Sequence, residues 1–156
     1  MIKPIDIENY ILETFQDVYP LSTWGEKSFF LNPENKFKRG TYFATIKQKD
    51  GENDKASNLS QENIYRLNIG ISKDMYLSLF DSLPKRPSKG GIILGNYNFH
   101  KKDIILPHPI YGWMGWISIL NPSQKTFKNC KSLLKNAYLK ALKITFKKEQ
   151  LLIKKI

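Results

Sequence analysis

The stretch GWISIL, residues 115–120, predicts a buried strand at the centre of the fold. It is short, apolar and rich in Trp and Ile, which are residue types that favour strands. Asn121-Pro122 follows it directly and is a turn signal. A short apolar run bounded by turn residues is typical of a buried strand, so we expect Gly115–Leu120 in the interior of a sheet.

A long helix is expected after this strand, with Ser123 as its N-cap. Its buried face is predicted from helical spacing and consists of Phe127, Cys130, Leu134, Tyr138, Ala141 and Thr145. The outer face carries Lys125, Lys128, Lys131 and Lys135. The pattern holds to about residue 142, and since no Gly or Pro follows, the remainder either continues the helix or frays.

Another helix is expected at the start of the chain. Its apolar residues recur at spacings of four, four and three, which puts them on one helical face: Ile7, Ile11, Phe15 and Val18. We expect this helix over about 6–18, with Asp6 as its N-cap and Pro20 closing it.

Three further strands are expected between the helices, at 27–31, 41–48 and 65–71. Strict alternation in the second strand puts alternate residues on opposite faces, with Tyr42, Ala44 and Ile46 on one face and Phe43, Thr45 and Lys47 on the other. In the third, one face holds Tyr65, Leu67, Ile69 and Ile71, and the other holds Arg66 and Asn68.

The connecting segments are read from their turn residues and charges. Residues 49–58 contain Asp50-Gly51 and mixed charges, which favour a solvated loop. Ser72 is expected to cap a short helix over 73–80, with inward side chains at Tyr76, Leu79, Phe80 and Leu83. Residues 84–103 are rich in Gly and Pro and predict a long surface loop, either without regular structure or with a short strand at 92–94.

This order of elements predicts an α+β fold. The sheet is expected to be mostly antiparallel with four or five strands, and the N- and C-terminal helices are expected to pack on one of its faces. No repeat or linker divides the chain. We therefore expect a single domain over 1–156, with a Lys-rich helix or tail from about residue 123.

The net charge of +11 is distributed very unevenly. Residues 123–156 contain ten lysines and one acid, Glu149, which leaves 15 basic and 13 acidic residues of the total 25 and 14 in residues 1–122. The lysines fit a solvated helix face, a contact with nucleic acid through phosphate groups, or a membrane-surface helix. The segment has no Arg for bidentate base contacts, and a lysine-rich composition also arises without a functional reason.

The common catalytic and metal-binding motifs are absent from the sequence. It has no GxSxG, P-loop, HExxH or CxxC pattern, and one cysteine with two histidines is too few for a usual zinc site. Cys130 is interpreted as a small buried hydrophobe. We therefore expect a protein that is not an enzyme and that has no cofactor or metal. A single cysteine and the lack of an apolar run of about 20 residues also favour the cytoplasm.

His108 is the more informative histidine because Pro107 and Pro109 restrict the backbone on both sides of it. One interpretation is structural, a rigid entry to the following strand with the imidazole bonded to backbone. The other is a small-molecule pocket formed by Arg66, Asn68, His108, Tyr111 and Trp113.

Several motifs together resemble a known family: YFATIKQKDG with a later ASNL, YRLNIGIS, and LPHPIYGWMGWISILNPS before a helix with Ala137-Tyr138. They resemble an uncharacterised bacterial family of small proteins, a domain of unknown function. More remotely, the Trp116 strand, NPS and the last helix are similar to the closing unit of the MmcQ/YjbR family. That resemblance implies a CyaY-like, double-wing α+β fold and, because the family has been described as predicted DNA-binding, a nucleic-acid partner.

Two functional hypotheses follow. The first is a non-enzymatic, MmcQ/YjbR-like protein that binds nucleic acid or another polyanion through Lys125, Lys128, Lys131 and Lys135. The alternative is a small-molecule or metabolite-binding protein with its cleft near His108.

Overall fold

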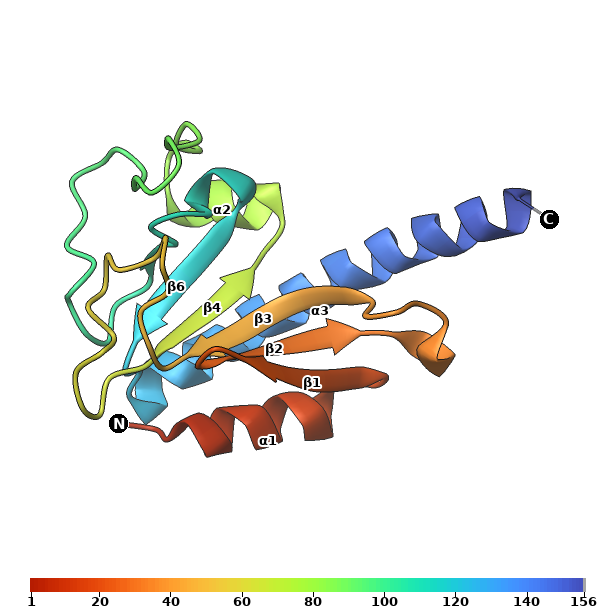
Figure 1. Ribbon diagram of the computed structural model, residues 1–156, viewed down its shortest axis with the longest axis horizontal. Helices are drawn as coiled ribbons and strands as arrows, with labels where there is room; N and C mark the ends of the chain where they lie inside the picture. Colours follow the sequence, from red (N-terminus) through yellow and green to blue (C-terminus); the bar gives the residue numbers. More distant parts are fainter. Residues whose placement is uncertain (156) are drawn as a thin grey trace.

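Six strands form one sheet in the order β1-β2-β3-β4-β6-β5, and every neighbouring pair is antiparallel (Figure 1). The computed structural model describes residues 1–155, so Ile156, part of the expected domain, lies outside the described residues. The strands are β1 (Val18–Thr23), β2 (Glu26–Leu31), β3 (Thr41–Lys47), β4 (Arg66–Gly70), β5 (Leu106–Pro107) and β6 (Trp116–Leu120). The α+β class is confirmed, whereas the expected count of four or five strands is wrong because β1 and the two-residue β5 were missed.

The first helix, α1 (Pro4–Thr14), begins and ends earlier than expected. Lys3 is the N-cap, and Asp6 lies one turn inside, where its carboxylate accepts a hydrogen bond from the Lys3 backbone N–H at 3.3 Å. Asp17 has a positive φ of 61°, which reverses the chain so that Val18 begins β1. Pro20 stands inside this edge strand and does not close the helix, because an edge strand tolerates the missing N–H.

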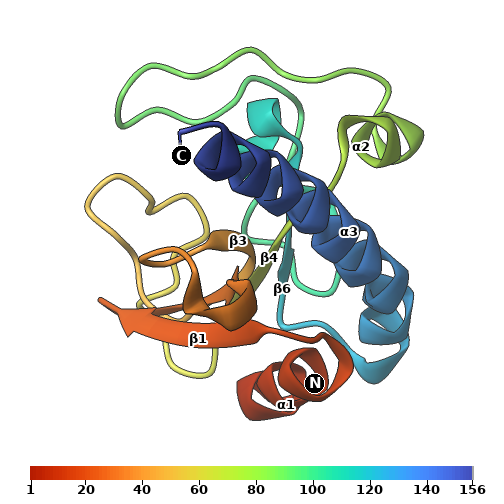
Figure 2. The same ribbon diagram turned by 90° about the vertical axis from the view of Figure 1, so that its right-hand side faces the viewer.

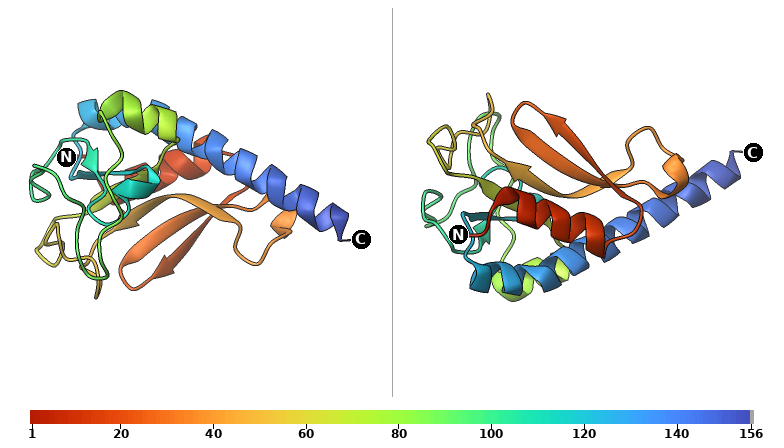
Figure 3. Two further views of the ribbon diagram at one scale, coloured as in Figure 1. Left: turned by 90° about the horizontal axis from the view of Figure 1, so that it is seen from above. Right: turned by 90° about the horizontal axis from the view of Figure 1, so that it is seen from below.

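The last helix, α3 (Gln124–Lys154), continues far past residue 142 and does not fray there. Ser123 caps it as expected, accepting from the Thr126 backbone N–H. The buried apolar side chains of α3 and of α1 belong to one hydrophobic cluster with those of the sheet. Both helices lie on the same face of the sheet, as expected (Figure 2). The last buried residue is Thr145, and the helix beyond it extends past the end of the sheet (Figures 1 and 3).

A bulge in β3 changes which side chains share a face. Phe29 pairs with Ala44 and Phe30 pairs with Tyr42, so Phe43 is the extra residue. Two consecutive side chains, Phe43 and Ala44, therefore reach the helix-covered core. The strict alternation expected for this strand is wrong because a bulge shifts the period by one position. As a result Tyr42 lies on the same face as Thr45 and Lys47.

The short helix α2 (Lys73–Leu79) follows β4, and Ser72 caps it as expected. Tyr76 is fully buried, but Leu79 is 41% exposed and does not point inward. Residues 84–103 form a loop without a strand at 92–94, although Ile93 is buried against the body. The chain returns through β5 and a one-turn 3-10 helix, Gly112–Met114, to β6, which lies between β4 and β5.

Candidate functional site

Polar side chains cover the sheet face opposite the helices. Strand register puts directly paired residues side by side, so they form two rows across the sheet. One row contains Ser28, Thr45, Asn68 and Ser118, and the next contains Glu26, Lys47 and Arg66. Sequence alternation predicted that Arg66 and Asn68 share this face, but the partners from β2 and β3 depend on the register.

A pocket of about 310 Å³ lies over these rows, and we call it the sheet-face pocket. Its floor includes Thr45, Lys47 and Asn68, and its sides include Tyr42, His108, Tyr111 and Trp116. Two of the aromatic rings, those of Tyr42 and Trp116, lie against each other with centroids 5.2 Å apart. Trp116 is held in this position above Gly70, where a Cβ would come within 2.7 Å of the indole.

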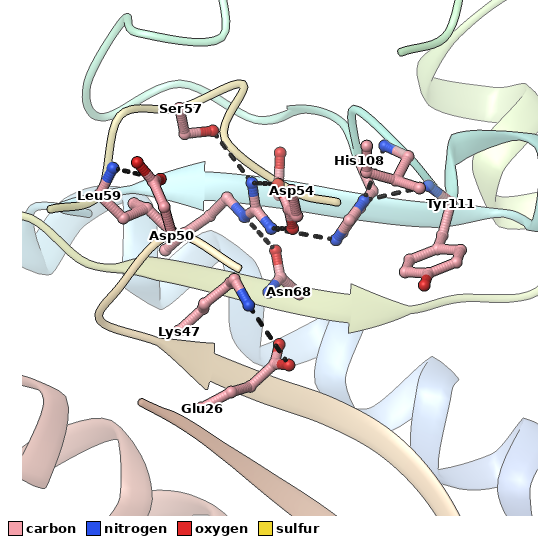
Figure 4. Close-up of polar contacts among 12 residues, drawn as sticks. Glu26, Lys47, Asp50, Asp54, Ser57, Leu59, Asn68, His108 and Tyr111 are labelled. Carbon is pink, nitrogen blue, oxygen red and sulfur yellow. Dashed lines mark hydrogen bonds and ion pairs between the residues drawn. The ribbon is translucent and has the colours of Figure 1, made fainter. Parts of the chain in front are cut away.

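Arg66 is completely buried beneath the pocket, and its guanidinium is held by residues of the 48–65 loop and of β4. Its two terminal nitrogens donate to both carboxylate oxygens of Asp54, and Nη1 also donates to Ser57 Oγ at 3.0 Å. Nε donates to Asn68 Oδ1 at 2.8 Å (Figure 4). The bidentate ion pair with Asp54 neutralises the buried positive charge of Arg66.

The hydrogen bonds on the pocket floor have a defined direction. The Thr45 hydroxyl donates to Glu26 Oε2 at 2.9 Å, so it can accept from Asn68 Nδ2, also at 2.9 Å. Asn68 Oδ1 is then free to accept from Arg66. Both neighbours therefore require the same orientation of the Asn68 amide. At the end of this series of hydrogen bonds, Lys47 Nζ forms a longer ion pair of 3.7 Å with Glu26 (Figure 4).

His108 is 3% exposed and is held through both backbone and ring. Its backbone N–H donates to the Trp116 carbonyl, and its Nδ1 accepts from the backbone N–H groups of Ile110 and Tyr111, both at 3.1 Å (Figure 4). Burial, and then the positive charges of Arg66 and Lys47, lower the pKa of His108 well below 6.5. The ring is therefore neutral at pH 7.

Residues 49–58 of the loop between β3 and β4 are mostly exposed or half-buried, as expected, but the loop also folds over this face of the sheet and contributes buried groups. Leu59 is fully buried, and its backbone N–H donates to Asp50 Oδ1 at 2.8 Å. Asp54 and Ser57 are positioned by this folded loop to bind Arg66. The charges of this segment thus satisfy a buried partner, which the local sequence pattern does not reveal.

Comparison with known proteins identifies a family. DUF6194, a family of unknown function, matches residues 2–150. The chain belongs to the DUF6194 family. No curated protein and no solved structure matches it. Membership confirms the resemblance to a family of unknown function, while the similarity to the MmcQ/YjbR family stays a hypothesis based on sequence motifs.

In this DUF6194 protein, four of the five residues of the expected pocket come together. Asn68, His108 and Tyr111 line the sheet-face pocket, and Arg66 lies directly beneath them. Trp113 does not line it and instead packs under the Arg86 guanidinium, 4.9 Å from its ring centroid. Sequence reasoning missed Tyr42, Thr45, Lys47, Glu26 and Asp54, because the bulge, strand register and loop path bring them there.

The four lysines expected to bind nucleic acid are all exposed on α3. None of them forms an ion pair within residues 1–155. Lys131 lies over the ring of Tyr10 from α1, with its Nζ 4.8 Å from the centroid. Lys125, Lys128 and Lys131 line a groove together with Asp6 and Tyr10, so this part of α3 lies beside α1.

The described part of the chain has one cysteine, and its environment makes it unreactive. Cys130 is fully buried, and burial raises the pKa of its thiol to about 12, so little reactive thiolate forms. Across residues 1–155, no group of three His, Cys, Asp or Glu side chains is arranged to hold a metal ion. In the same range no helix has the length and apolar character needed to cross a membrane.

Proposed function

We propose that this protein binds a small polar molecule in the sheet-face pocket. The main support for this proposal is the oriented polar network on the pocket floor. Successive hydrogen bonds in this network join Arg66, Asn68, Thr45 and Glu26. A buried ion pair such as Arg66–Asp54 contributes little stability compared with apolar packing of the same volume. Arg66 instead supports recognition indirectly, because its Nε donates to Asn68 Oδ1 and so fixes the Asn68 amide on the pocket floor. Ligand sites combine a few such oriented polar groups with apolar walls.

The walls of the pocket supply the apolar part of such a site. Tyr42 and Trp116 lie against each other on one side, and Tyr111 lies beside His108 with ring centroids 5.0 Å apart. Aromatic faces favour a planar ligand, which stacks on them with little loss of its own conformational freedom. A volume of about 310 Å³ is within the range of small-molecule sites.

A blocking variant tests this proposal. Ser28→Tyr adds a large side chain from a strand residue that lines the pocket, whereas Ser22→Tyr adds the same side chain at an exposed position of the edge strand β1. Saturation-transfer NMR with a panel of nucleosides, amino acids, aromatic acids and sugars should detect ligands for the parent and for Ser22→Tyr, and none for Ser28→Tyr. The proposal is wrong if no compound binds the parent, or if Ser28→Tyr binds the same compounds equally well.

Nucleic-acid binding is a second candidate, and the unpaired, exposed lysines of α3 support it. Lysines aligned on one face bind phosphates mainly by releasing counterions, so affinity falls steeply with salt. We expect a slope of about −0.9 in log K against log salt for each phosphate contacted on duplex DNA. Fluorescence anisotropy at several salt concentrations measures this slope.

Charge reversal separates a lysine-specific contact from a general effect of net charge. Reversing Lys128, Lys131 and Lys135 to Glu should reduce the slope by about one unit per lost contact. The control reverses three exposed lysines far from α3 in sequence, Lys38, Lys85 and Lys89, and so changes the net charge equally. Equal losses in both variants, or no binding by the parent at low salt, would reject this candidate.

A further inference from the structure

The protonation of the His108 ring is determined by its hydrogen bonds. Two backbone N–H groups, of Ile110 and Tyr111, point at Nδ1, and backbone N–H groups can only donate. Nδ1 must therefore be the acceptor nitrogen. In a neutral imidazole the other nitrogen then carries the proton, so Nε2 is a donor.

This Nε2–H group has no acceptor among residues 1–155. Its one hydrogen-bond contact is with Arg66 Nη2 at 3.3 Å, and a guanidinium nitrogen is also a donor. Two donors face each other in a buried site, which is unfavourable unless another group accepts from them. Because His108 and Asn68 line the sheet-face pocket, an oxygen of a bound molecule can supply this acceptor.

Lys47 presents a second donor to the same pocket. Its side chain is 9% exposed, and its Nζ donates no hydrogen bond within the described residues; its ion pair with Glu26 is 3.7 Å long. Asn68 adds another donor, since only one of its two amide hydrogens is used by Thr45. Lys47 and Asn68 thus add unused donors beside His108. The carboxylate acceptors that line the pocket, Glu26 and Asp54, already have partners in Thr45, Lys47 and Arg66.

We infer that the ligand of the sheet-face pocket is an aromatic carboxylate, with its carboxylate accepting from His108 Nε2–H, Lys47 supplying positive charge, and its ring packing against Tyr42, Tyr111 and Trp116. This inference rests on the proposed small-molecule function. It assigns His108 as a ligand-binding residue and Lys47 as the source of the counter-charge.

A phosphate ester fits the same donors less well. Arg66 is committed to Asp54, so it cannot clamp a phosphate bidentately. Glu26 also lines the pocket, with 31% of its side chain exposed, and repels a dianion more strongly than a monoanion. The ligand is therefore expected to carry a single negative charge.

Three probes with one ring and different polar groups test the inference: phenylacetate, phenylacetamide and phenyl phosphate. Chemical-shift titration of the full-length protein should show the tightest binding for phenylacetate. The affinities of the other two probes should be lower by a factor of about ten or more. Phenylacetamide binds more weakly because a hydrogen bond to a charged acceptor is stronger than one to an amide. Phenyl phosphate binds more weakly because the dianion is repelled. Equal affinity for the amide, tighter binding of the phosphate, or no binding of phenylacetate would overturn the inference.

Two variants of His108 isolate its role. His108→Asn keeps an oxygen acceptor near the position of Nδ1 but removes the Nε2 donor, so the fold is retained and affinity for phenylacetate should fall about tenfold. His108→Gln puts an amide donor near Nε2 and should recover part of that affinity. Lys47→Met should also weaken phenylacetate binding, with little effect on phenylacetamide. Unchanged affinity in His108→Asn would contradict the assignment even if other molecules bind the pocket and the proposed function holds.

A direct readout of the ring does not depend on finding a ligand. Long-range ¹H–¹⁵N NMR of the free protein at pH 7 should report a neutral His108 with the proton on Nε2. A second readout uses the ligand. The affinity for phenylacetate should stay constant from about pH 6 to 8, because the ring does not titrate there. A proton on Nδ1 would refute the inference. Affinity that weakens steadily as the pH rises would indicate an imidazolium contact and would also refute it.

Discussion

At the scale of single residues, the Arg66–Asp54 pair has the largest predicted effect on stability. Arg66 is fully buried, and removal of its carboxylate partner leaves a guanidinium charge without compensation. We expect Asp54→Ala to lower the free energy of unfolding by about 3–5 kcal/mol in urea titrations. Glu52→Ala, at an exposed position of the same loop, should have almost no effect.

The same reasoning predicts a rescue. Replacing the arginine as well, in Arg66→Met with Asp54→Ala, removes the uncompensated charge and should restore part of the lost stability. If Asp54→Ala unfolds at the same urea concentration as the parent, the Arg66–Asp54 pair does not contribute to stability as its burial indicates.

His108 should make stability depend on pH in a narrow window. The unfolded chain takes up a proton on this residue near pH 6.5, whereas the folded chain does so only well below that value. The unfolded state then holds more protons, so the free energy of unfolding falls as the pH is lowered through 6.5. The slope approaches about 1.4 kcal/mol per pH unit as the histidine of the unfolded chain becomes fully protonated. Urea titrations between about pH 5.5 and 7 measure this slope.

His108→Asn provides the control for that measurement. It should remove most of the slope, because it removes the buried imidazole whose pKa is lowered in the folded protein. A parent protein whose stability is flat across this window would show that the folded ring binds a proton as readily as the unfolded one.

At the scale of elements, the end of α3 is predicted to be dispensable for stability. Thr145 is the last buried side chain, and the contacts beyond it are exposed ones, such as that of Lys148 Nζ with Thr41 Oγ1 at 3.1 Å. A chain ending at Phe146 should keep its free energy of unfolding within about 1 kcal/mol, because exposed polar contacts contribute little. Thermal unfolding followed by circular dichroism tests this.

A shorter chain is the matched comparison. Ending at Lys140 also removes the buried Ala141 and Thr145, and should lower the melting temperature clearly. If the chains ending at Phe146 and at Lys140 have the same melting temperature, the boundary between the core-packed and extended parts of α3 lies elsewhere.

At the scale of the whole molecule, the packing predicts one cooperative unfolding transition. A single hydrophobic cluster joins α1, the sheet and α3. Trp fluorescence and far-ultraviolet circular dichroism should therefore give coincident urea curves. Trp24→Phe is a useful background, since Trp24 is 96% exposed and its removal leaves Trp113 and Trp116 as reporters. Two separated transitions would contradict the expectation of a single domain.

What the sequence determined by itself is local. An apolar run next to turn residues located strand β6, and the spacing of apolar residues located both terminal helices. The caps at Ser72 and Ser123 were also correct. These features depend on neighbours within a few residues. The same local reasoning identified Asn68 and His108 as candidate pocket residues.

Only the tertiary structure decided the composition of the candidate site. The bulge at Phe43 moved Tyr42 to the pocket face, and the register of β2 with β3 brought Glu26 beside Lys47. The folded 48–65 loop brought Asp54 onto Arg66, which lies 12 residues further along the chain. These contacts depend on which strands pair, in what register, and where a loop folds back, and such choices are set by the global packing of the core and not by any single segment.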